Sequence, residues 1–274
     1  MTTRSLDRGL TRALSFSASG RRFPAGTDFL DGIVSNMELE LQMNTDQGQR
    51  ILNKTASPDS GASQTDNDFF LGLTSGSDST DPTFNTDRHD FDGGDLFTAA
   101  VDTSFMDTVN FSSNCDITFI IVFDKGATLA NNDYLFSSGS IAFGGLSLNQ
   151  RSNGDLRVQQ DSGGTSLFSD LAISISTTTT DNVLVLSINA ANSRLDAHYN
   201  SKTPVSNTAL SFDTTDTDDS STETAAIGAN INTQFLPNGD SMSFFAIRNK
   251  ESTDAEAESI IDYLSDNGFI TAIP

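Results

Sequence analysis

The chain has 274 residues, a formal net charge of −22, one cysteine and no tryptophan. This excess of carboxylates would repel nucleic acid and anionic lipid, and a single cysteine excludes an intramolecular disulfide. No apolar run approaches the length of about 18 residues that spans a membrane, so we predict neither a nucleic-acid partner nor membrane insertion. The acidic surface is explained either by adaptation to high salt, which screens repulsion, or by solubility alone.

The first 25 residues are basic in this otherwise acidic chain. Asp7 is their only acidic residue, and their arginines are Arg4, Arg8, Arg12, Arg21 and Arg22. We predict that residues 1–36 form an arm that docks on an acidic neighbour, such as another copy of the chain. A disordered tail or a first strand of the main domain is the alternative. No continuous apolar stretch follows the arginines, so no secretory signal is predicted.

Residues 37–274 are expected to form one domain, in which short apolar runs are separated by Gly, Asn, Asp, Ser and Thr. Residues 117–123 and 183–189 are almost continuously apolar, which predicts strands buried on both faces. Residues 156–159 and 195–199 alternate, as half-solvated strands do. Asn153 and Gly154 lie between two apolar segments and predict a hairpin turn, since both residues tolerate positive φ. The 20 phenylalanines are the expected core filler.

A single helix is predicted after a last strand over residues 241–248. Thr253 and Glu256 have the spacing of a capping box, and Asn267-Gly268 supplies a C-terminal stop. The apolar stripe of the helix consists of Ala257, Ile260, Ile261 and Leu264. The expected fold class is therefore all-β: an antiparallel β-sandwich with one short C-terminal helix.

Several of these segments follow one another in a familiar order. Phe91-Asp-Gly-Gly-Asp-Leu-Phe97 reads F-D-G-x-D-x-hydrophobic, and Tyr134–Gly139 reads y-l-f-s-x-G. Two central strands, an x-I-G strand and a closing strand with a helical tail follow, at residues 182–188, 194–199, 226–228 and 241–270. Together they resemble the laminin-G-like, concanavalin A-like jelly-roll domains of lectins and glucanases. The resemblance covers residues 37–270 and departs from the family in lacking tryptophan.

This resemblance raises the question of catalysis, because such folds include β-glucanases with alternating acidic residues on one strand. Glu38 and Glu40 share a face of a predicted strand, as paired carboxylates of glycoside hydrolases do. No third acid follows at the required spacing, so we interpret this segment as a solvated edge strand. His89 and His198 are isolated and are interpreted as surface or hydrogen-bonded structural residues. No catalytic residue and no enzymatic activity are predicted.

Two loops are rich in carboxylates and raise the question of a metal. Calcium requires six to eight oxygen ligands, and neither loop has the spacing of an EF-hand. Some laminin-G-like domains hold calcium at the rim of the sandwich, so the resemblance implies calcium as the one candidate cofactor. A solvated loop is the alternative. The candidate ligands are Asp213, Asp216, Asp218 and Asp219, and the second loop contains Asp66, Asp68, Asp78 and Asp81.

Laminin-G-like domains with a basic arm and a surface rich in Ser, Thr, Asp and Asn look like virion proteins of tailed viruses. The resemblance implies a non-catalytic structural virion protein: a capsid decoration, a collar or tail spike, or a receptor-binding component. It would be made in the host cytoplasm without a signal peptide and dock on other virion proteins through its arm. It would form a homo-oligomer, with a trimer favoured, and display the sandwich outward, where a host surface glycan is a candidate ligand.

Two alternatives remain open. The first is a free carbohydrate-binding lectin, although no aromatic platform for stacking a sugar stands out in a chain without tryptophan. The second is a polysaccharide-degrading enzyme.

Overall fold

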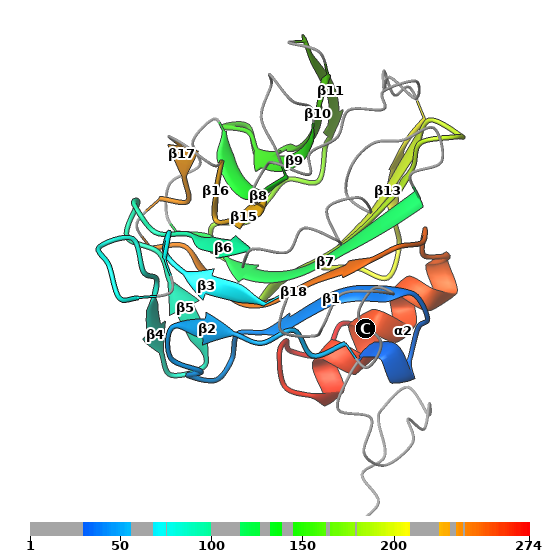
Figure 1. The fold of residues 1–274 in the computed structure, drawn as a ribbon. Coiled ribbons are helices and arrows are strands. Elements are labelled where there is room, and N and C mark those ends of the chain that lie inside the picture. The colour runs from blue at the N-terminus through cyan, green and yellow to red at the C-terminus, as the bar shows by residue number, and fades with distance from the viewer. Residues whose placement is uncertain are drawn as a thin grey trace, which may run out of the picture.

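The computed structural model describes residues 30–55, 68–74, 76–99, 116–126, 132–138, 145–162, 165–178, 180–208, 225–230, 234–237 and 239–274. In this part of the chain, two large antiparallel sheets face each other and one α-helix, α2 (Asp254–Asp266), covers one of them (Figure 1). The all-β sandwich with a C-terminal helix is therefore confirmed. The helix is too short to cross a membrane.

The two sheets are named A and B. Sheet A runs in the order β14 (Val205–Asn207), β13 (Arg194–Tyr199), β12 (Asn182–Asn189), β7 (Asp116–Asp124), β18 (Ser241–Arg248), β5 (Arg88–Asp90) and β4 (Thr83–Asn85), and β1 (Met37–Gln42) also pairs with β18. Sheet B runs in the order β11 (Thr165–Leu171), β10 (Leu156–Ser162), β9 (Gly145–Gln150), β8 (Asp133–Ser138), β15 (Ala225–Ile227), β6 (Phe97–Ala99), β3 (Phe69–Leu71) and β2 (Arg50–Ile51). A two-stranded ribbon consists of β16 (Ala229–Asn230) and β17 (Gln234–Phe235).

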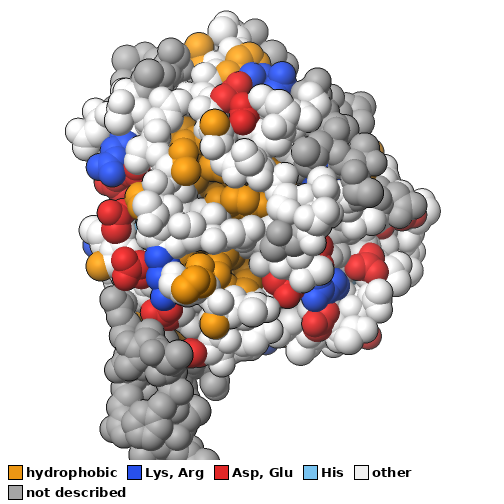
Figure 2. Space-filling model, turned by 180° about the vertical axis from the view of Figure 1, so that it is seen from behind, with side chains coloured by type: hydrophobic (Ala, Val, Ile, Leu, Met, Phe, Trp, Pro, Cys, Tyr) orange, Lys and Arg blue, Asp and Glu red, His pale blue; other side chains and the backbone are white. Residues whose placement is uncertain are grey.

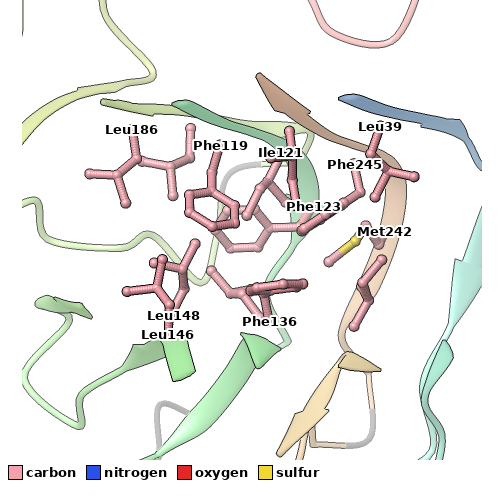
Figure 3. Packing of buried hydrophobic residues seen from close by; sticks show 14 of the residues in the cluster. Leu39, Phe119, Ile121, Phe123, Phe136, Leu146, Leu148, Leu186, Met242 and Phe245 are labelled. Carbon is pink, nitrogen blue, oxygen red and sulfur yellow. The ribbon is translucent and has the colours of Figure 1, made fainter. Parts of the chain in front are cut away.

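Phenylalanines from both sheets meet in the core between the sheets, as the composition predicted. Phe119 of β7, Phe136 of β8 and Phe245 of β18 lie together there (Figure 3). The ring centres of Phe119 and Phe136 are 5.3 Å apart, and those of Phe136 and Phe245 are 5.4 Å apart. Rings at these separations contribute contact energy beyond the burial of their area. This contact between β7, β8 and β18 joins sheet A to sheet B.

A second apolar layer explains why β7 is buried on both faces. Ile117, Phe119 and Ile121 point into the core between the sheets, whereas Ile120 and Val122 point to the opposite face of sheet A. That face is covered by the apolar stripe of α2, whose predicted residues are all buried. The predicted capping box of α2 is also present. Sheet A is thus closed on both faces.

The same layer changes the interpretation of β1. The sequence suggested a solvated edge strand, but the side chain of Glu40 has no exposed surface. Glu40 accepts hydrogen bonds from the backbone N of Leu30 at 2.9 Å and from Nε2 of Gln42 at 3.0 Å, and Tyr263 OH lies at 3.4 Å. Because α2 and the 3₁₀ turn η1 (Leu30–Gly32) lie over β1, the solvated-strand prediction is wrong.

Strand β13 alternates as predicted, but it is not half-solvated. Leu195 and Ala197 belong to the core, and the intervening Asp196 and His198 are also buried. Asp196 is covered because β14 continues the sheet beyond it, where Ser206 donates to its carboxylate. Nε2 of His198 lies 3.5 Å from Oδ1 of Asp254 at the start of α2.

Of the predicted N-terminal arm, the structure describes residues 30–36. Leu30 and Val34 are buried in the layer beneath α2, so this end of the segment packs against the sandwich. Arg4, Arg8, Arg12, Arg21 and Arg22 lie outside the described residues, and so do Asp213, Asp216, Asp218 and Asp219. The boundary after residue 36 stays a prediction.

Candidate functional site

The outer face of sheet B differs from the other described sheet faces. The interior faces of both sheets are filled by the core, and the outer face of sheet A is covered by α2. On sheet B, the β16–β17 ribbon covers the region of β15, where Ala229 packs on Ala226 and Leu96. The outer face of strands β8 to β11, beside the ribbon (Figure 1), is the candidate site; its β8 and β9 side chains are buried, and its β10 and β11 side chains reach the surface.

Strand register places eight side chains on this face in two rows. Residues directly opposite each other in antiparallel strands share a face, so each row can be followed from strand to strand. The first row is Tyr134, Asn149, Arg157 and Asp170, and the second is Ser137, Ser147, Gln159 and Phe168. We call these eight residues the polar face. Between them, apolar residues such as Leu148 and Val158 point inward to the core.

Three neighbouring side chains of the polar face carry buried polar atoms without hydrogen-bond partners. Asn149 is 0% exposed and both of its amide atoms lack a partner. Ser137 and Ser147, which pair directly across β8 and β9, are 2% and 5% exposed, and neither hydroxyl has a partner. An unpaired buried polar group costs about 1–3 kcal/mol. Native proteins satisfy such groups with ordered water or a ligand, so this cluster is a candidate position for either.

Beside this cluster lies a charged and aromatic group formed by strands β10 and β11. Arg157 donates to the Asp170 carboxylate through Nε at 2.6 Å and through Nη2 at 2.7 Å. Its guanidinium carbon lies 4.4 Å from the centre of the Phe168 ring. The hydrogen bonds from Arg157 hold the pKa of Asp170 below its usual value. The result is a flat, rigid group whose aromatic ring is 47% exposed.

The side chains of the polar face suit binding, and they do not include the carboxylate pair of the common glycoside hydrolases. That common mechanism uses two carboxylates with different protonation states, whereas sialidases use a tyrosine nucleophile. Of the eight side chains of the polar face, Asp170 is the only carboxylate, and it is engaged with Arg157. The remaining groups are hydroxyl, amide and aromatic, which suit hydrogen bonding and stacking.

Of the carboxylates that the sequence singled out in the second loop, Asp66 lies outside the described residues and the other three have partners within the protein. Asp68 pairs with Arg50 at 2.7 Å and accepts from the backbone N of Asn53. Asp78 and Asp81 accept hydrogen bonds within their own loop, from Thr80 and from the backbone N of Asp78. No group of carboxylates, histidines or cysteines among the described residues is arranged to hold a metal ion. His89 is buried and its Nδ1 lies 3.1 Å from the carbonyl oxygen of Met43, which confirms a structural role.

A buried ionic cluster at the ends of β7, β8 and β18 was not foreseen. Lys125 donates to Asp133 at 2.9 Å and to Asp240 at 2.5 Å, and all three side chains are almost completely buried. Burial raises the pKa of Asp240 to about 6, even though Lys125 lies beside it. This cluster joins the two sheets.

Many basic side chains on the surface lie next to acidic ones. On the face drawn in Figure 2, the larger groups of Lys or Arg atoms adjoin Asp or Glu atoms, and hydrophobic side chains reach the surface between them. Arg88, Arg194 and Lys202 each form an ion pair with a nearby carboxylate. The positive charge of these side chains is therefore balanced locally.

The polar face was missed from the sequence, although one signal could have indicated part of it. The sequence Gly163-Gly164 is typical of a turn, and in the structure Ser162 pairs with Thr165. Counting five residues back from Ser162 and five forward from Thr165 along the two strands sets Arg157 opposite Asp170. The buried amide of Asn149 has no such signal, because its burial depends on what covers the sheet.

No protein-family model and no curated protein sequence matches the chain. Among solved structures, Trypanosoma rangeli sialidase in complex with sialic acid is similar, with a TM-score of 0.58 and 11% identity over 96% of this chain and 37% of the sialidase. The receptor binding domain of botulinum neurotoxin C/D mosaic serotype has a TM-score of 0.54 and 17% identity, over 83% of this chain and 51% of that one. The receptor binding domain of botulinum neurotoxin D has a TM-score of 0.53 and 16% identity, over 83% of this chain and 52% of that one.

The chain thus spans only about a third to a half of the length of these structures. At such low identity the likeness is one of fold. What this chain shares with the sialidase and the two receptor binding domains is an antiparallel, lectin-like β-sandwich.

Proposed function

We propose that the chain is a non-catalytic recognition protein whose polar face binds a glycan. The observation that carries this proposal is the cluster of unpaired buried polar atoms at Ser137, Ser147 and Asn149, beside the exposed ring of Phe168. Ligand sites combine apolar contact surface with a few fixed polar groups that orient the ligand. A sugar offers both, because its C–H groups stack on an aromatic ring while its hydroxyls donate and accept hydrogen bonds.

The neighbours in structure include both receptor binding domains and a sialidase, and the groups of the polar face favour recognition. A hydrolase of the two-carboxylate type would require a second, independently titrating carboxylate near the bound sugar. The eight residues of the polar face do not supply one, which favours binding without turnover.

A glycan array probed with the full chain tests the proposal, and Asn149→Leu separates function from structure. Leucine has a similar size and removes two unpaired buried polar atoms, so the free energy of unfolding should stay equal or rise. Glycan binding should fall about tenfold or more, as expected when a buried hydrogen-bonding group is removed from a ligand site.

Ser243→Ala is the matched control. Its hydroxyl is also buried and unpaired, but it belongs to β18 in sheet A and lies away from the polar face. Glycan binding by this variant should equal that of the wild type. If the full chain binds no glycan, or if Asn149→Leu binds as the wild type does, the proposal is wrong.

We further propose that this module is carried on the particle of a tailed virus, as the sequence resemblance implied. The basic segment over residues 1–25 would dock on an acidic partner, and the sandwich would face outward. Deletion of residues 1–25 should abolish assembly and leave glycan binding intact. An unchanged oligomer size in light scattering would contradict this docking role.

A further inference from the structure

The polar face contains one guanidinium, and that group is already neutralised. Arg157 directs Nε and Nη2 at the two carboxylate oxygens of Asp170, in the bidentate geometry that best satisfies an arginine. One planar face of the guanidinium is covered as well, because its carbon lies 4.4 Å from the ring centre of Phe168. A carboxylate or sulfate of a ligand would therefore meet a guanidinium whose charge is already balanced by Asp170.

A second arginine acts on the same carboxylate. Arg151, in the turn between β9 and β10, donates through Nη1 to Oδ1 of Asn132 at 3.1 Å. Its positive charge contributes, after Arg157, to the low pKa of Asp170. The carboxylate that accepts two hydrogen bonds from Arg157 is therefore the negative charge that balances the guanidinium of the polar face.

The rest of the molecule adds to this effect. The chain carries a formal net charge of −22, so an approaching anion meets a repulsive field over much of the surface. A neutral sugar does not experience this repulsion, and it requires only an apolar surface and hydrogen-bonding partners, which Phe168 offers on the exposed side of the polar face and Ser137, Ser147 and Asn149 on its buried side.

From these observations we infer that the polar face selects neutral glycans over sialylated or sulfated ones, and that Asp170 is the residue that determines this specificity. The inference rests on the proposed function and adds the chemical class of the ligand. It also separates this chain from the sialidase of similar fold, whose structure contains sialic acid.

Asp170→Asn tests this inference on an array that holds neutral glycans and their sialylated and sulfated counterparts. The substitution keeps the shape of the side chain and removes its charge, so Arg157 becomes available to an anion. Binding to the anionic glycans, relative to their neutral counterparts, should rise about fivefold or more and should weaken again at high salt. The wild type should prefer the neutral member of each pair.

Two further variants control for other effects. Asp266→Asn removes the same charge from the exposed end of α2, over sheet A, and should bind as the wild type does. Arg157→Gln combined with Asp170→Asn should lose the gain for anionic glycans, because the gain depends on the freed guanidinium. The melting temperature of each variant shows whether it is folded.

The outcomes separate the two proposals. Preferential binding of sialylated or sulfated glycans by the wild type overturns the inference and leaves glycan binding in place. The same conclusion follows if folded Asp170→Asn gains nothing for anionic glycans. If neither the wild type nor any variant binds a glycan, the proposed function falls and the inference falls with it.

Discussion

Arg248 and Glu256 join the last strand to the C-terminal helix through a hydrogen bond of 2.7 Å between Nη2 and Oε1. Arg248 is completely buried, and its Nε also donates to the backbone oxygen of Ser35 at 2.7 Å. Glu256 is at the same time the third residue of α2, where its carboxylate accepts from the backbone N of Thr253. One carboxylate therefore completes the helix cap and neutralises a buried cation.

Replacing this carboxylate should destabilise the fold. In Glu256→Gln, the buried Arg248 guanidinium loses its counter-ion, and the free energy of unfolding should fall by roughly 1–3 kcal/mol. Asp266→Asn removes the same charge from the exposed C-terminal end of the same helix and should change stability by less than about 0.5 kcal/mol. Urea unfolding of both variants measures the difference. Equal stability of the two variants would show that the Arg248–Glu256 pair contributes nothing.

The same pair predicts acid sensitivity. The hydrogen bond from Arg248 lowers the pKa of Glu256 to about 2, below the value of about 4.5 expected in the unfolded chain. The folded state therefore binds the proton less tightly, so the stabilisation is present above pH 4.5 and is lost as the pH falls towards 2. Urea unfolding at pH 5 and pH 3 should show a smaller loss in Glu256→Gln than in the wild type. A loss of the same size in both would argue against this assignment.

For Asp240 we expect the opposite dependence of stability on pH, namely a loss of stability as the pH rises. Burial raises its pKa to about 6 from an ordinary value of 3.8, so the folded state binds this proton more tightly than the unfolded state. The contribution is fully present below pH 3.8 and is lost as the pH rises through 6. The wild type should therefore be more stable at pH 5 than at pH 7, by an amount of order 1 kcal/mol.

Asp240→Asn is the variant that checks this assignment, by urea unfolding at both pH values. Burial also raises the pKa of Asp95 to about 6, so part of the slope should remain in Asp240→Asn and disappear when Asp95→Asn is added. A double variant that keeps the full slope between pH 5 and pH 7 would rule out these two carboxyls as its source.

We expect a single methyl group added at Gly228 to lower the stability of the fold strongly. Its φ is +82°, and a Cβ at this position would lie 2.3 Å from Cε1 of Phe91. Gly228→Ala should cost roughly 2–4 kcal/mol, because backbone strain adds to a clash with a buried ring. Gly48 has a similar φ of +73° with nothing within 4 Å, so Gly48→Ala should cost only the strain of about 1 kcal/mol. Thermal unfolding compares the two, and equal costs would show that the Phe91 contact is unimportant.

The elements that the sequence predicted best are those whose signals are local. The capping box of Thr253 and Glu256, the apolar stripe of α2 and the double-sided burial of β7 depend on spacing along the chain, and the structure confirms all three. The Asn153-Gly154 hairpin is confirmed as well, although only Gly154 has positive φ. These signals were sufficient to establish the all-β sandwich with one terminal helix.

The sequence predicted less well those features that depend on which distant segment packs over a strand. The sequence of β1 alternates like that of an exposed strand, yet α2 lies over it and buries Glu40. In the polar face, Tyr134, Asn149, Arg157 and Asp170 come from four strands, and only their register places them in one row. Spacing along the chain determines periodicity and caps because these forces act within a few residues. Burial of a polar side chain and the meeting of distant strands are decided by what packs against them, and only the tertiary structure contains that information.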